Sequence, residues 1–493
     1  MDKQLNKKAR TIITTDGEVD DMNSFLRYLL YSNELDTEGI ILTSSVYHYA
    51  GDAEKGIAPE RWTGEKWIPH LISEYEKVYS NLKVHADGYP TPEYLRSIYH
   101  IGNIGFKGEY EQETDGSQFL ENYLIKDKDD RPLYIQTWGG TNTTARALKS
   151  IEEKYSHNPE WLSIKKRIEE KVIIYIILDQ DDTYNEYIAK NWRIKVINDK
   201  FNFWYFAYLW KLSDQHLTQR LRNTWQKKLV HNYGSFLKNY ALIGDGRVIE
   251  GEDENEQRGI DLYLENNPEY QRFDFISEGD SPSFFYLLNN GLRNDSDPTF
   301  GGWGGRFVEK SPILYTNEAM DLNPYTKRYE ATYTLTRWFD DIQDDFIARA
   351  AWSATDNFDK VAHYPIIELD SSLNLEVSAG EQVKYTAHAK DPNGRNLYYK
   401  WWVYDEASTY NESNYLNPKQ EDIDGFLIGY SAEANSENYD KVRIEGEDQP
   451  TVSINIPNDI SAGQTIHVIL EVKNDGDNPL KTYRRIILTA KGD

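Results

Sequence analysis

Three short segments of the sequence gather several carboxylates within a few residues. They are Asp16-Gly17-Glu18-Val19-Asp20-Asp21, Asp179-Gln180-Asp181-Asp182 and Glu278-Gly279-Asp280-Ser281, and each follows an apolar run. Ionised carboxylates at this spacing repel one another unless one is protonated or a cation lies between them. A divalent ion that prefers oxygen ligands, such as calcium, is the simplest such cation. On these residues alone, the alternative is a set of acidic loops that begin helices, where aspartate is favourable.

Apolar runs and helical segments alternate along the first part of the chain, and they would position these carboxylates. The runs are continuous, which is typical of strands covered on both faces. They occupy residues 11–16, 39–45, 132–140, 172–182, 193–198 and 272–281, and helical spacing of apolar residues occupies 22–32, 68–82 and 141–155. This pattern predicts an α/β fold with a mainly parallel sheet and helices on both faces. Because open parallel sheets bind ligands beyond the carboxyl ends of their strands, the residues that end the strands are the candidate site residues.

The pattern changes near residue 366. Short segments that alternate apolar and polar residues, separated by turn signals, lie at 373–405, 451–457, 465–476 and 483–490. Such segments predict an antiparallel, immunoglobulin-like β-sandwich. We therefore predict two domains, an α/β domain over residues 1–363 and a β-sandwich domain over residues 364–493.

The composition excludes several classes of protein. The chain has 493 residues with 81 acidic and 55 basic side chains, which gives a formal net charge of −26. No stripe of Lys and Arg is present to meet a phosphate backbone, so nucleic acid is not an expected partner. No run of about 20 apolar residues is present, so no membrane-spanning helix is expected. Because the chain has no cysteine, disulfides, thiolate catalysis and zinc–cysteine sites are excluded.

Two motifs carry a resemblance to a known family. The spacing Asp16-x-x-x-Asp20-Asp21, after a predicted strand and before a predicted helix, resembles the aspartate signature of nucleoside hydrolases. The segment Thr137-Trp138-Gly139-Gly140-Thr141-Asn142 resembles the Thr-Gly-Pro-Leu-Thr-Asn segment of that family. More narrowly, the chain looks like a nucleoside-hydrolase-like branch, often labelled cellulose-binding, that joins this domain to a C-terminal β-sandwich. The segments that carry the narrower resemblance are 179–182, 281–284, 290–292, 297–306, 345–349, 401–404 and 466–470.

The resemblance implies a calcium-dependent hydrolase of an N- or O-glycosidic bond, in which the ion holds a water molecule and sugar hydroxyls. Asp16 and Asp21 would bind the calcium, Thr141 would add its backbone carbonyl, and Asp345 would complete the site. Asp16 would also be the catalytic base toward the attacking water, and Asp20 would bind a sugar hydroxyl. The chemistry is consistent, because a metal acidifies water and nearby carboxylates favour an oxocarbenium-like transition state.

Three departures from the family pattern bear on the substrate. Asp344 stands where many nucleoside hydrolases have a histidine proposed to protonate the leaving base, the first loop lacks the Pro-Gly of the signature, and residues 43–48 lack the asparagine expected after the second strand. The reaction class is therefore better supported than a nucleoside substrate. The expected ligands are a small sugar, a nucleoside or an oligosaccharide. The alternative function is non-catalytic carbohydrate binding, and a weaker one is a structural module for assembly.

Further residues complete the candidate substrate site: His48, Asn142, Asp179, Asp182, Glu278, Asp280 and Trp303. His48 could act as a general acid, although an isolated histidine more often caps, packs or is exposed. The aromatic run 201–210 could stack sugars, but core packing or a dimer face is the interpretation we favour. The acidic stretch 250–257 is most simply a solvated loop.

The sequence leaves the oligomeric state and the compartment open. Nucleoside hydrolases tend to assemble, so a homo-oligomer is one expectation. The first ten residues are polar and lack the apolar core of a signal peptide,, whereas the resembling proteins are commonly exported. We therefore expect either export with a leader absent from this sequence, or the cytoplasm.

Overall fold

The structure, a computed structural model, describes residues 8–411, 415–435 and 442–492. These residues form two compact units. The α/β unit comprises residues 8–288 and 308–317, and the C-terminal unit comprises the described residues of 289–307 and 318–492. The chain therefore leaves the α/β unit after residue 288 and returns to it for one short segment.

An eight-stranded sheet forms the centre of the α/β unit, in the order β3-β2-β1-β4-β5-β6-β8-β7. All neighbouring strands are parallel except β7 and β8. The strands are β1 (Ala9–Thr15), β2 (Leu35–Leu42), β3 (Tyr99–Ile101), β4 (Leu133–Thr137), β5 (Val172–Ile177), β6 (Lys195–Asp199), β7 (Val308–Ser311) and β8 (Leu314–Thr316). The predicted parallel sheet is confirmed, and every residue of β4 is buried.

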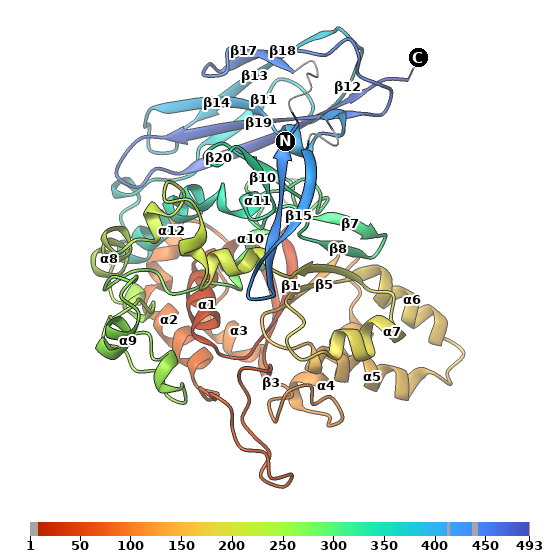
Figure 1. The fold of residues 1–493 in the computed structure, drawn as a ribbon, viewed down its shortest axis with the longest axis vertical. Coiled ribbons are helices and arrows are strands. Elements are labelled where there is room, and N and C mark those ends of the chain that lie inside the picture. Colours follow the sequence, from red (N-terminus) through yellow and green to blue (C-terminus); the bar gives the residue numbers. More distant parts are fainter. Residues whose placement is uncertain (1–7, 412–414, 436–441, 493) are drawn as a thin grey trace. The chain divides into compact units, whose positions relative to one another are not determined.

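Helices cover both faces of this sheet, so successive strand residues enter different cores. On β4, Leu133 and Ile135 pack in one apolar cluster, whereas Tyr134 packs against Tyr286 on the other face. Figure 1 places α4 to α7 together on one side of the strands and α1 and α2 on the other. The helices of this unit are α1 (Val19–Tyr31), α2 (Trp67–His85), α3 (Pro92–Ser97), α4 (Asp115–Lys126), α5 (Asn142–Tyr155), α6 (Trp161–Lys171), α7 (Ala189–Asn191), α8 (Asn223–Asn232), α9 (Asp261–Asn266) and α10 (Ser281–Phe285).

One strand prediction is wrong. Residues 272–281 are largely buried, but they consist of turns and irregular backbone up to the start of α10, and only Phe275 among them forms a β-bridge, to Leu242. Their backbone amides instead bond to three separate segments, with Phe273 donating to Ile243, Phe275 to Leu221 and Glu278 to Phe206. The position beside β6 belongs to β8, a three-residue strand that is too short to leave an apolar signal in the sequence.

The C-terminal unit contains the predicted sandwich. Two four-stranded sheets, ordered β11-β13-β18-β17 and β12-β20-β19-β14, contribute apolar residues to one shared core. Trp401 lies in this core, and its neighbour Trp402 is only half-buried. The strands are β11 (Ile366–Leu369), β12 (Asn374–Val377), β13 (Gln382–Lys390), β14 (Leu397–Val403), β17 (Arg443–Glu445), β18 (Thr451–Asn455), β19 (Thr465–Asn474) and β20 (Lys481–Ala490).

A third sheet and two helices complete the C-terminal unit. The sheet has the order β15-β16-β10-β9 and consists of β9 (Asp321–Asn323), β10 (Arg328–Glu330), β15 (Tyr415–Ile423) and β16 (Phe426–Ala434). The helices are α11 (Tyr333–Thr336) and α12 (Phe339–Ala354). On α12, Asp341 pairs with Lys481 of β20 at 2.7 Å and Asp344 with Lys473 of β19 at 3.3 Å. These ion pairs link α12 to the sandwich strands, and residues 318–363 accordingly belong to the C-terminal unit. The domain boundary at 363/364 stays a prediction.

Within the described ranges, no helix is long and apolar enough to cross a membrane.

Candidate functional site

Four buried aspartates gather at the carboxyl end of the central strands. Asp16 follows β1, Asp20 and Asp21 lie in the first turn of α1, and Asp280 precedes α10. Each of the four is at most 7% exposed. Asp20, Asp21 and Asp280 each offer a carboxylate oxygen, and these three oxygens lie within 4.8 Å of one another. We call the four residues the carboxylate cluster.

Two glycines allow the backbone to approach these carboxylates closely. A Cβ atom on Gly139, which follows β4, would lie 2.9 Å from the Cβ of Asp16. A Cβ atom on Gly279 would lie 2.8 Å from Oδ2 of Asp20. Atoms at such separations overlap, so only glycine fits between these segments without a shift of the backbone.

The carboxylates have few hydrogen-bond donors of their own. Oδ1 of Asp21 accepts a bond from the backbone amide of Asp16 at 3.2 Å and one from the Thr15 hydroxyl. Oδ1 of Asp20 accepts a bond from the Tyr208 hydroxyl at 3.3 Å. Three further oxygens are buried but have no hydrogen-bond partner among the residues that the structure describes. They are both carboxylate oxygens of Asp16 and Oδ2 of Asp280. Buried acceptors without donors are costly, so these oxygens are suited to a bound cation.

The electrostatics of the cluster agree with this geometry. Burial, and then the other acidic groups, raise the pKa of Asp20 to about 8. Burial likewise raises the pKa of Asp16, Asp21 and Asp280, the last two well above the usual range, and neighbouring carboxylates add to the effect. A divalent cation would remove this repulsion, because hard cations such as Ca²⁺ take several carboxylate oxygens as ligands. The residues present therefore fit such an ion.

A small pocket adjoins the cluster. Its cavity of about 20 Å³ has room for an ion or a water molecule,. The lining consists of acidic, aromatic and a few other side chains, namely Glu18, Asp20, Asp21, Tyr47, Trp138, Ile177, Leu178, Gln180, Phe203, Trp204, Tyr208 and Asp280. All of these residues belong to the α/β unit. Tyr47 is an exposed member of this lining.

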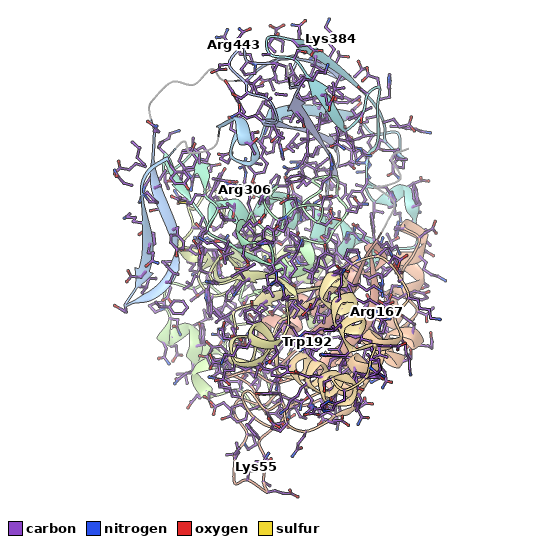
Figure 2. All side chains as sticks on the ribbon, turned by 90° about the vertical axis from the view of Figure 1, so that its right-hand side faces the viewer. Lys55, Arg167, Trp192, Arg306, Lys384 and Arg443 are labelled. Carbon is purple, nitrogen blue, oxygen red and sulfur yellow. The ribbon has the colours of Figure 1, made fainter. Side chains whose placement is uncertain are left out.

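His48 is buried and lies between two carboxylates, one of which, that of Glu18, belongs to the pocket lining. Its Nε2 is 3.0 Å from Oε1 of Glu252, and its Nδ1 is 3.9 Å from Oε2 of Glu18. Burial acts to lower the pKa of His48, but the carboxylates outweigh it and raise the pKa overall. Nε of Arg61 donates to Glu252 at 2.7 Å. Arg61 and His48 come from the segment between β2 and α2, whose far end is marked by Lys55 in Figure 2.

The interpretation of 250–257 as a solvated loop is wrong for Glu252. Its side chain is 1% exposed because His48 and Arg61 both contact its carboxylate. Glu250, in contrast, is exposed. The partners of Glu252 lie about 200 positions earlier in the chain, and nothing in the local sequence indicates them.

Thr141 and Asn142 lie at the start of α5, where they organise the backbone. The carbonyl of Thr141 accepts a bond from the amide of Ala145 at 2.8 Å, and the Thr141 hydroxyl contacts that of Thr183. The side chain of Asn142 donates to the Ser44 hydroxyl, and its backbone amide donates to Asp181 at 3.0 Å. Neither residue is among those that line the pocket, and the roles predicted for them stay predictions.

Three other acids predicted for the site, Asp179, Asp182 and Glu278, have partners outside the cluster. Asp179 receives a bond from the Asn185 side chain at 2.6 Å, and Asp182 is exposed and pairs with Lys107 at 2.7 Å. Glu278 is fully buried, and its carboxylate contacts the Arg27 guanidinium at 2.6 and 2.8 Å. The structure therefore does not bring Asp179, Asp182 and Glu278 into the lining of the pocket, although they end the same strands or segments.

Asp345 and Trp303 belong to the C-terminal unit and have partners there. The carboxylate of Asp345 is 3.1 Å from Nε of Arg349 and accepts a bond from the Tyr364 hydroxyl at 2.6 Å. The indole nitrogen of Trp303 donates to the Tyr483 hydroxyl at 3.3 Å, and the ring is 2% exposed. Metal binding by Asp345 and substrate binding by Trp303 stay predictions.

The aromatic run 201–210 serves two purposes. Phe201, Phe206 and Trp210 are fully buried, as core packing requires. Phe203, Trp204 and Tyr208 instead line the pocket. Sequence reasoning did not name these three residues, nor Glu18 and Gln180, as part of the site. Gln180 belongs to the motif 179–182, of which the sequence analysis named only the aspartates. A segment of four residues does not show which of its side chains will line a pocket.

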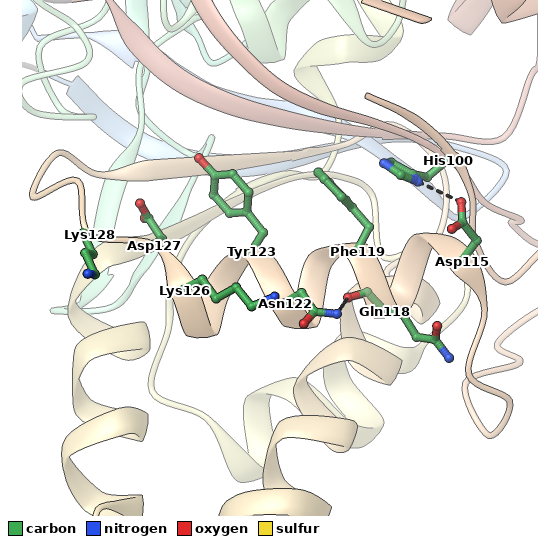
Figure 3. Close-up of a pocket in the computed structure, with 9 residues that line it drawn as sticks. All are labelled: His100, Asp115, Gln118, Phe119, Asn122, Tyr123, Lys126, Asp127 and Lys128. Atoms are coloured by element: carbon green, nitrogen blue, oxygen red, sulfur yellow. Dashed lines mark hydrogen bonds and ion pairs between the residues drawn. The ribbon is translucent and has the colours of Figure 1, made fainter. Parts of the chain in front are cut away.

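A wider groove lies elsewhere, along α4, and has a volume of about 670 Å³ (Figure 3). In it the His100 ring stacks on Phe119 with centroids 4.1 Å apart, and Nδ1 of His100 is 2.7 Å from Asp115. Its lining consists of His100, Asp115, Gln118, Phe119, Asn122, Tyr123, Lys126, Asp127 and Lys128. None of these nine is a predicted site residue, so we take the small acidic pocket, and not the larger groove, as the candidate site.

Solved structures include one similar to nearly the whole chain. It is a nucleoside hydrolase-related hypothetical protein from Saccharophagus degradans, whose description associates it with carbohydrate metabolism. The two share 24% identity over 98% of this chain and 100% of that one, with a TM-score of 0.69. The type III effector XopQ, solved with adenosine diphosphate ribose, has 11% identity over 71% of this chain and 95% of its own, and a TM-score of 0.34. An inosine-guanosine nucleoside hydrolase has 10% identity over 71% and 99%, and a TM-score of 0.30.

Comparison with sequence families gives the membership of the chain. No curated protein sequence matches it. A family described as "Cellulose-binding protein Sde0182, C-terminal domain" matches residues 382–490. The family described as "Cellulose-binding Sde182, nucleoside hydrolase-like domain" matches residues 10–307, which is more than half of the chain. The predicted resemblance is thereby confirmed. The chain belongs to the family described as "Cellulose-binding Sde182, nucleoside hydrolase-like domain".

Proposed function

We propose that the protein hydrolyses a glycosidic bond, N- or O-linked, with the help of a divalent cation, for which calcium is the natural candidate. The observation that carries the proposal is the carboxylate cluster of Asp16, Asp20, Asp21 and Asp280, with its buried oxygens that lack donors among the described residues. The cluster lies at the carboxyl end of a parallel sheet, and folds with such sheets bind their ligands at that end.

Each residue of the cluster has a role in this proposal. Asp21 and Asp280, together with Asp16, would hold the cation, which when bound would orient and acidify a water molecule. Asp16 accepts the proton of the water that attacks the anomeric carbon, and Asp20 accepts a hydrogen bond from a sugar hydroxyl. The negative charge of the cluster favours the positive charge that develops on the sugar ring. Thr141 is proposed to complete the coordination through its backbone carbonyl, as the resemblance implies.

A carbohydrate is the substrate class that we propose: a small sugar derivative, a nucleoside or an oligosaccharide. The family description names cellulose binding, and the Saccharophagus degradans protein is described as associated with carbohydrate metabolism. The pocket combines acceptor oxygens with the rings of Phe203, Trp204 and Tyr208. Carbohydrate ligands have hydroxyl donors on their edges and apolar faces on their rings. The hydroxyls would donate to the acceptor oxygens of the pocket, and the apolar faces would pack on its aromatic rings.

The test is turnover of a panel of substrates in calcium chloride: inosine, uridine, and 4-nitrophenyl glycosides of glucose, xylose and ribose. We expect hydrolysis of at least one, and a loss in Asp16→Asn of about 10²- to 10⁴-fold in kcat, the range for removal of a general base. Asp182→Asn is the matched control, because Asp182 is exposed and lies outside the pocket lining. Failure of the wild-type protein to cleave any member would contradict the proposal.

The second candidate function is carbohydrate binding without turnover. The family descriptions favour it, because both name cellulose binding. Under this alternative, sugars bind and no glycoside is cleaved at any calcium concentration. Under the first, Asp16→Asn still binds sugar but no longer cleaves it.

A further inference from the structure

Gln180 lines the pocket and has a buried acceptor atom without a partner among the described residues. Its side-chain amide donates from Nε2 to the carbonyls of Trp138 at 2.6 Å and Ile177 at 3.1 Å. Because both partners are acceptors, the nitrogen must face them and Oε1 must face the other way. Oε1 is buried and has no donor among the residues that the structure describes. Gln180 is also one of the residues that line the pocket.

The surrounding backbone holds this side chain in place. The two carbonyls belong to the ends of β4 and β5, so the amide bridges two central strands. The carbonyl of Gln180 accepts a bond from the amide of Val46 at 3.2 Å, which ties it to the segment that carries Tyr47. Leu178 has φ of +60°, a left-handed conformation that is unusual for leucine,. Strained residues of this kind cluster at binding sites, where they turn the chain sharply.

We infer that Gln180 is a specificity-determining residue, whose Oε1 accepts a hydrogen bond from a hydroxyl group of a carbohydrate ligand. The inference rests on the proposed function for the class of ligand. An unpaired buried acceptor strongly disfavours ligands that have no donor to offer, because the acceptor then stays unpaired. Aromatic and apolar neighbours, among them Phe203, Trp204 and Leu178, would pack against the carbon face of the same ring.

The assignment separates Gln180 from the aspartates of its own motif. Asp181 caps α5 and is bonded to the hydroxyl of Thr183 at 2.7 Å, while Asp179 and Asp182 pair with Asn185 and Lys107. The recognition role within the motif therefore falls to its neutral member. A neutral acceptor suits a neutral donor such as a hydroxyl, and it leaves the cation to the charged cluster.

The experiment measures binding with D-glucose, D-xylose, D-ribose and cellobiose in calcium chloride, by calorimetry and by tryptophan fluorescence. Trp138 and Trp204 line the pocket and would report ring stacking. We expect Gln180→Met, of similar length but without the amide, to weaken the tightest-binding sugar about fivefold to tenfold, in line with one lost hydrogen bond. Asp182→Asn, two positions away and exposed, should bind within about twofold of wild type.

Calcium titration of the same variants checks that the carboxylate cluster is intact, and unchanged calcium affinity is expected. Should Gln180→Met fail to fold, monodeoxy analogues of the tightest-binding sugar are measured on the wild-type protein alone, and one of them is expected to bind about fivefold to tenfold more weakly. One monodeoxy analogue should bind wild type more weakly than the parent sugar does, but bind Gln180→Met as well as the parent sugar does. The hydroxyl that this analogue lacks is the one that donates to Gln180.

Three results would overturn the inference: equal sugar affinity in wild type and Gln180→Met, equal affinity of wild type for the sugar and for each of its monodeoxy analogues, or no binding of any of the four sugars. Binding of free adenine instead of a sugar would also overturn the assignment to a hydroxyl. If sugar binding depends on Gln180 but the protein hydrolyses no glycoside, the proposed hydrolysis is contradicted and the inference about Gln180 is supported.

Discussion

Buried aspartates in the two units have opposite surroundings. In the C-terminal unit, the fully buried Asp321 pairs with Arg306 and Arg337, each at 2.8 Å, and accepts a bond from Tyr404 at 2.5 Å. These partners outweigh burial and lower the pKa of Asp321. In the α/β unit, Asp16, Asp20, Asp21 and Asp280 have raised pKa values. The first arrangement satisfies a charge with protein cations, and the second leaves room for a cation from solution.

The same contrast occurs over two residues within the α/β unit. Glu278 meets Arg27 in a buried ion pair and also accepts bonds from Tyr240 and Ser281. Asp280 faces Asp20 and Asp21 instead. The same side-chain chemistry thus forms a structural ion pair at Glu278, whereas at Asp280 we propose that it binds a cation. The difference teaches that partners, and not residue type, separate a structural carboxylate from a functional one.

The largest expected effect concerns Asp321. Asp321→Asn removes the charge that Arg306 and Arg337 share, and breaking a buried ion pair in this way costs about 3–5 kcal/mol. Asp21→Asn, measured without metal, should cost less than about 1 kcal/mol because it relieves repulsion. Urea unfolding of both variants in EDTA measures the two free energies. Equal costs for the two substitutions would remove the distinction between the units.

Next in size is stabilisation by calcium. A ligand that binds only the folded state stabilises it by about 2.7 kcal/mol at 100 times its Kd. We expect the wild-type protein to gain this amount, and Asp280→Asn to gain less than about a third of it at the same concentration, since a ligand is lost. Asp182→Asn, whose carboxylate is exposed, is the control that keeps the full gain. Unfolding with calcium and with EDTA gives the difference.

A smaller effect is expected at Glu252. Glu252→Ala leaves His48 and Arg61 without their buried partner, and such unpaired groups cost about 2 kcal/mol. Glu250→Ala, in the same acidic stretch but exposed, should change stability by less than about 0.5 kcal/mol. Chemical unfolding compares them. If Glu252→Ala proves as mild as Glu250→Ala, the stretch behaves as the solvated loop predicted from sequence.

The smallest effect is a dependence on pH. The pKa of Asp20 is raised from 3.8 to about 8 in the folded state. Between these values the folded protein binds more protons than the unfolded one, so stability falls as pH rises, by about 1.4 kcal/mol per pH unit for one proton. Asp321, with its lowered pKa, acts oppositely: its contribution is present above about pH 4 and is lost as the pH falls further.

Urea unfolding in EDTA between pH 6 and 7, for wild type and Asp20→Asn, measures this dependence. We expect the variant to lose less stability than wild type over that unit, and calcium to abolish the difference. Parallel pH profiles for the two proteins in EDTA would mean that Asp20 is ionised in the metal-free fold.

The sequence predicted well those features that depend on neighbouring residues. Continuous apolar runs gave five of the six expected strands, and the signature from Asp16 to Asp21 gave the first loop and the start of α1. Features set by distant residues were not predictable. Arg27 and Glu278 are 251 positions apart, so no local pattern could separate Glu278 from Asp280. Likewise, the burial of Glu252 depends on Arg61 and His48.

The central claim is that the carboxylate cluster binds a divalent cation, and calcium calorimetry of the metal-free protein tests it most directly. The account predicts one site per chain in wild type and in Asp182→Asn, and no measurable site in Asp21→Asn or Asp280→Asn while both variants stay folded. A wild-type protein that takes up no calcium, or one whose binding is unchanged in Asp21→Asn and Asp280→Asn, would contradict it.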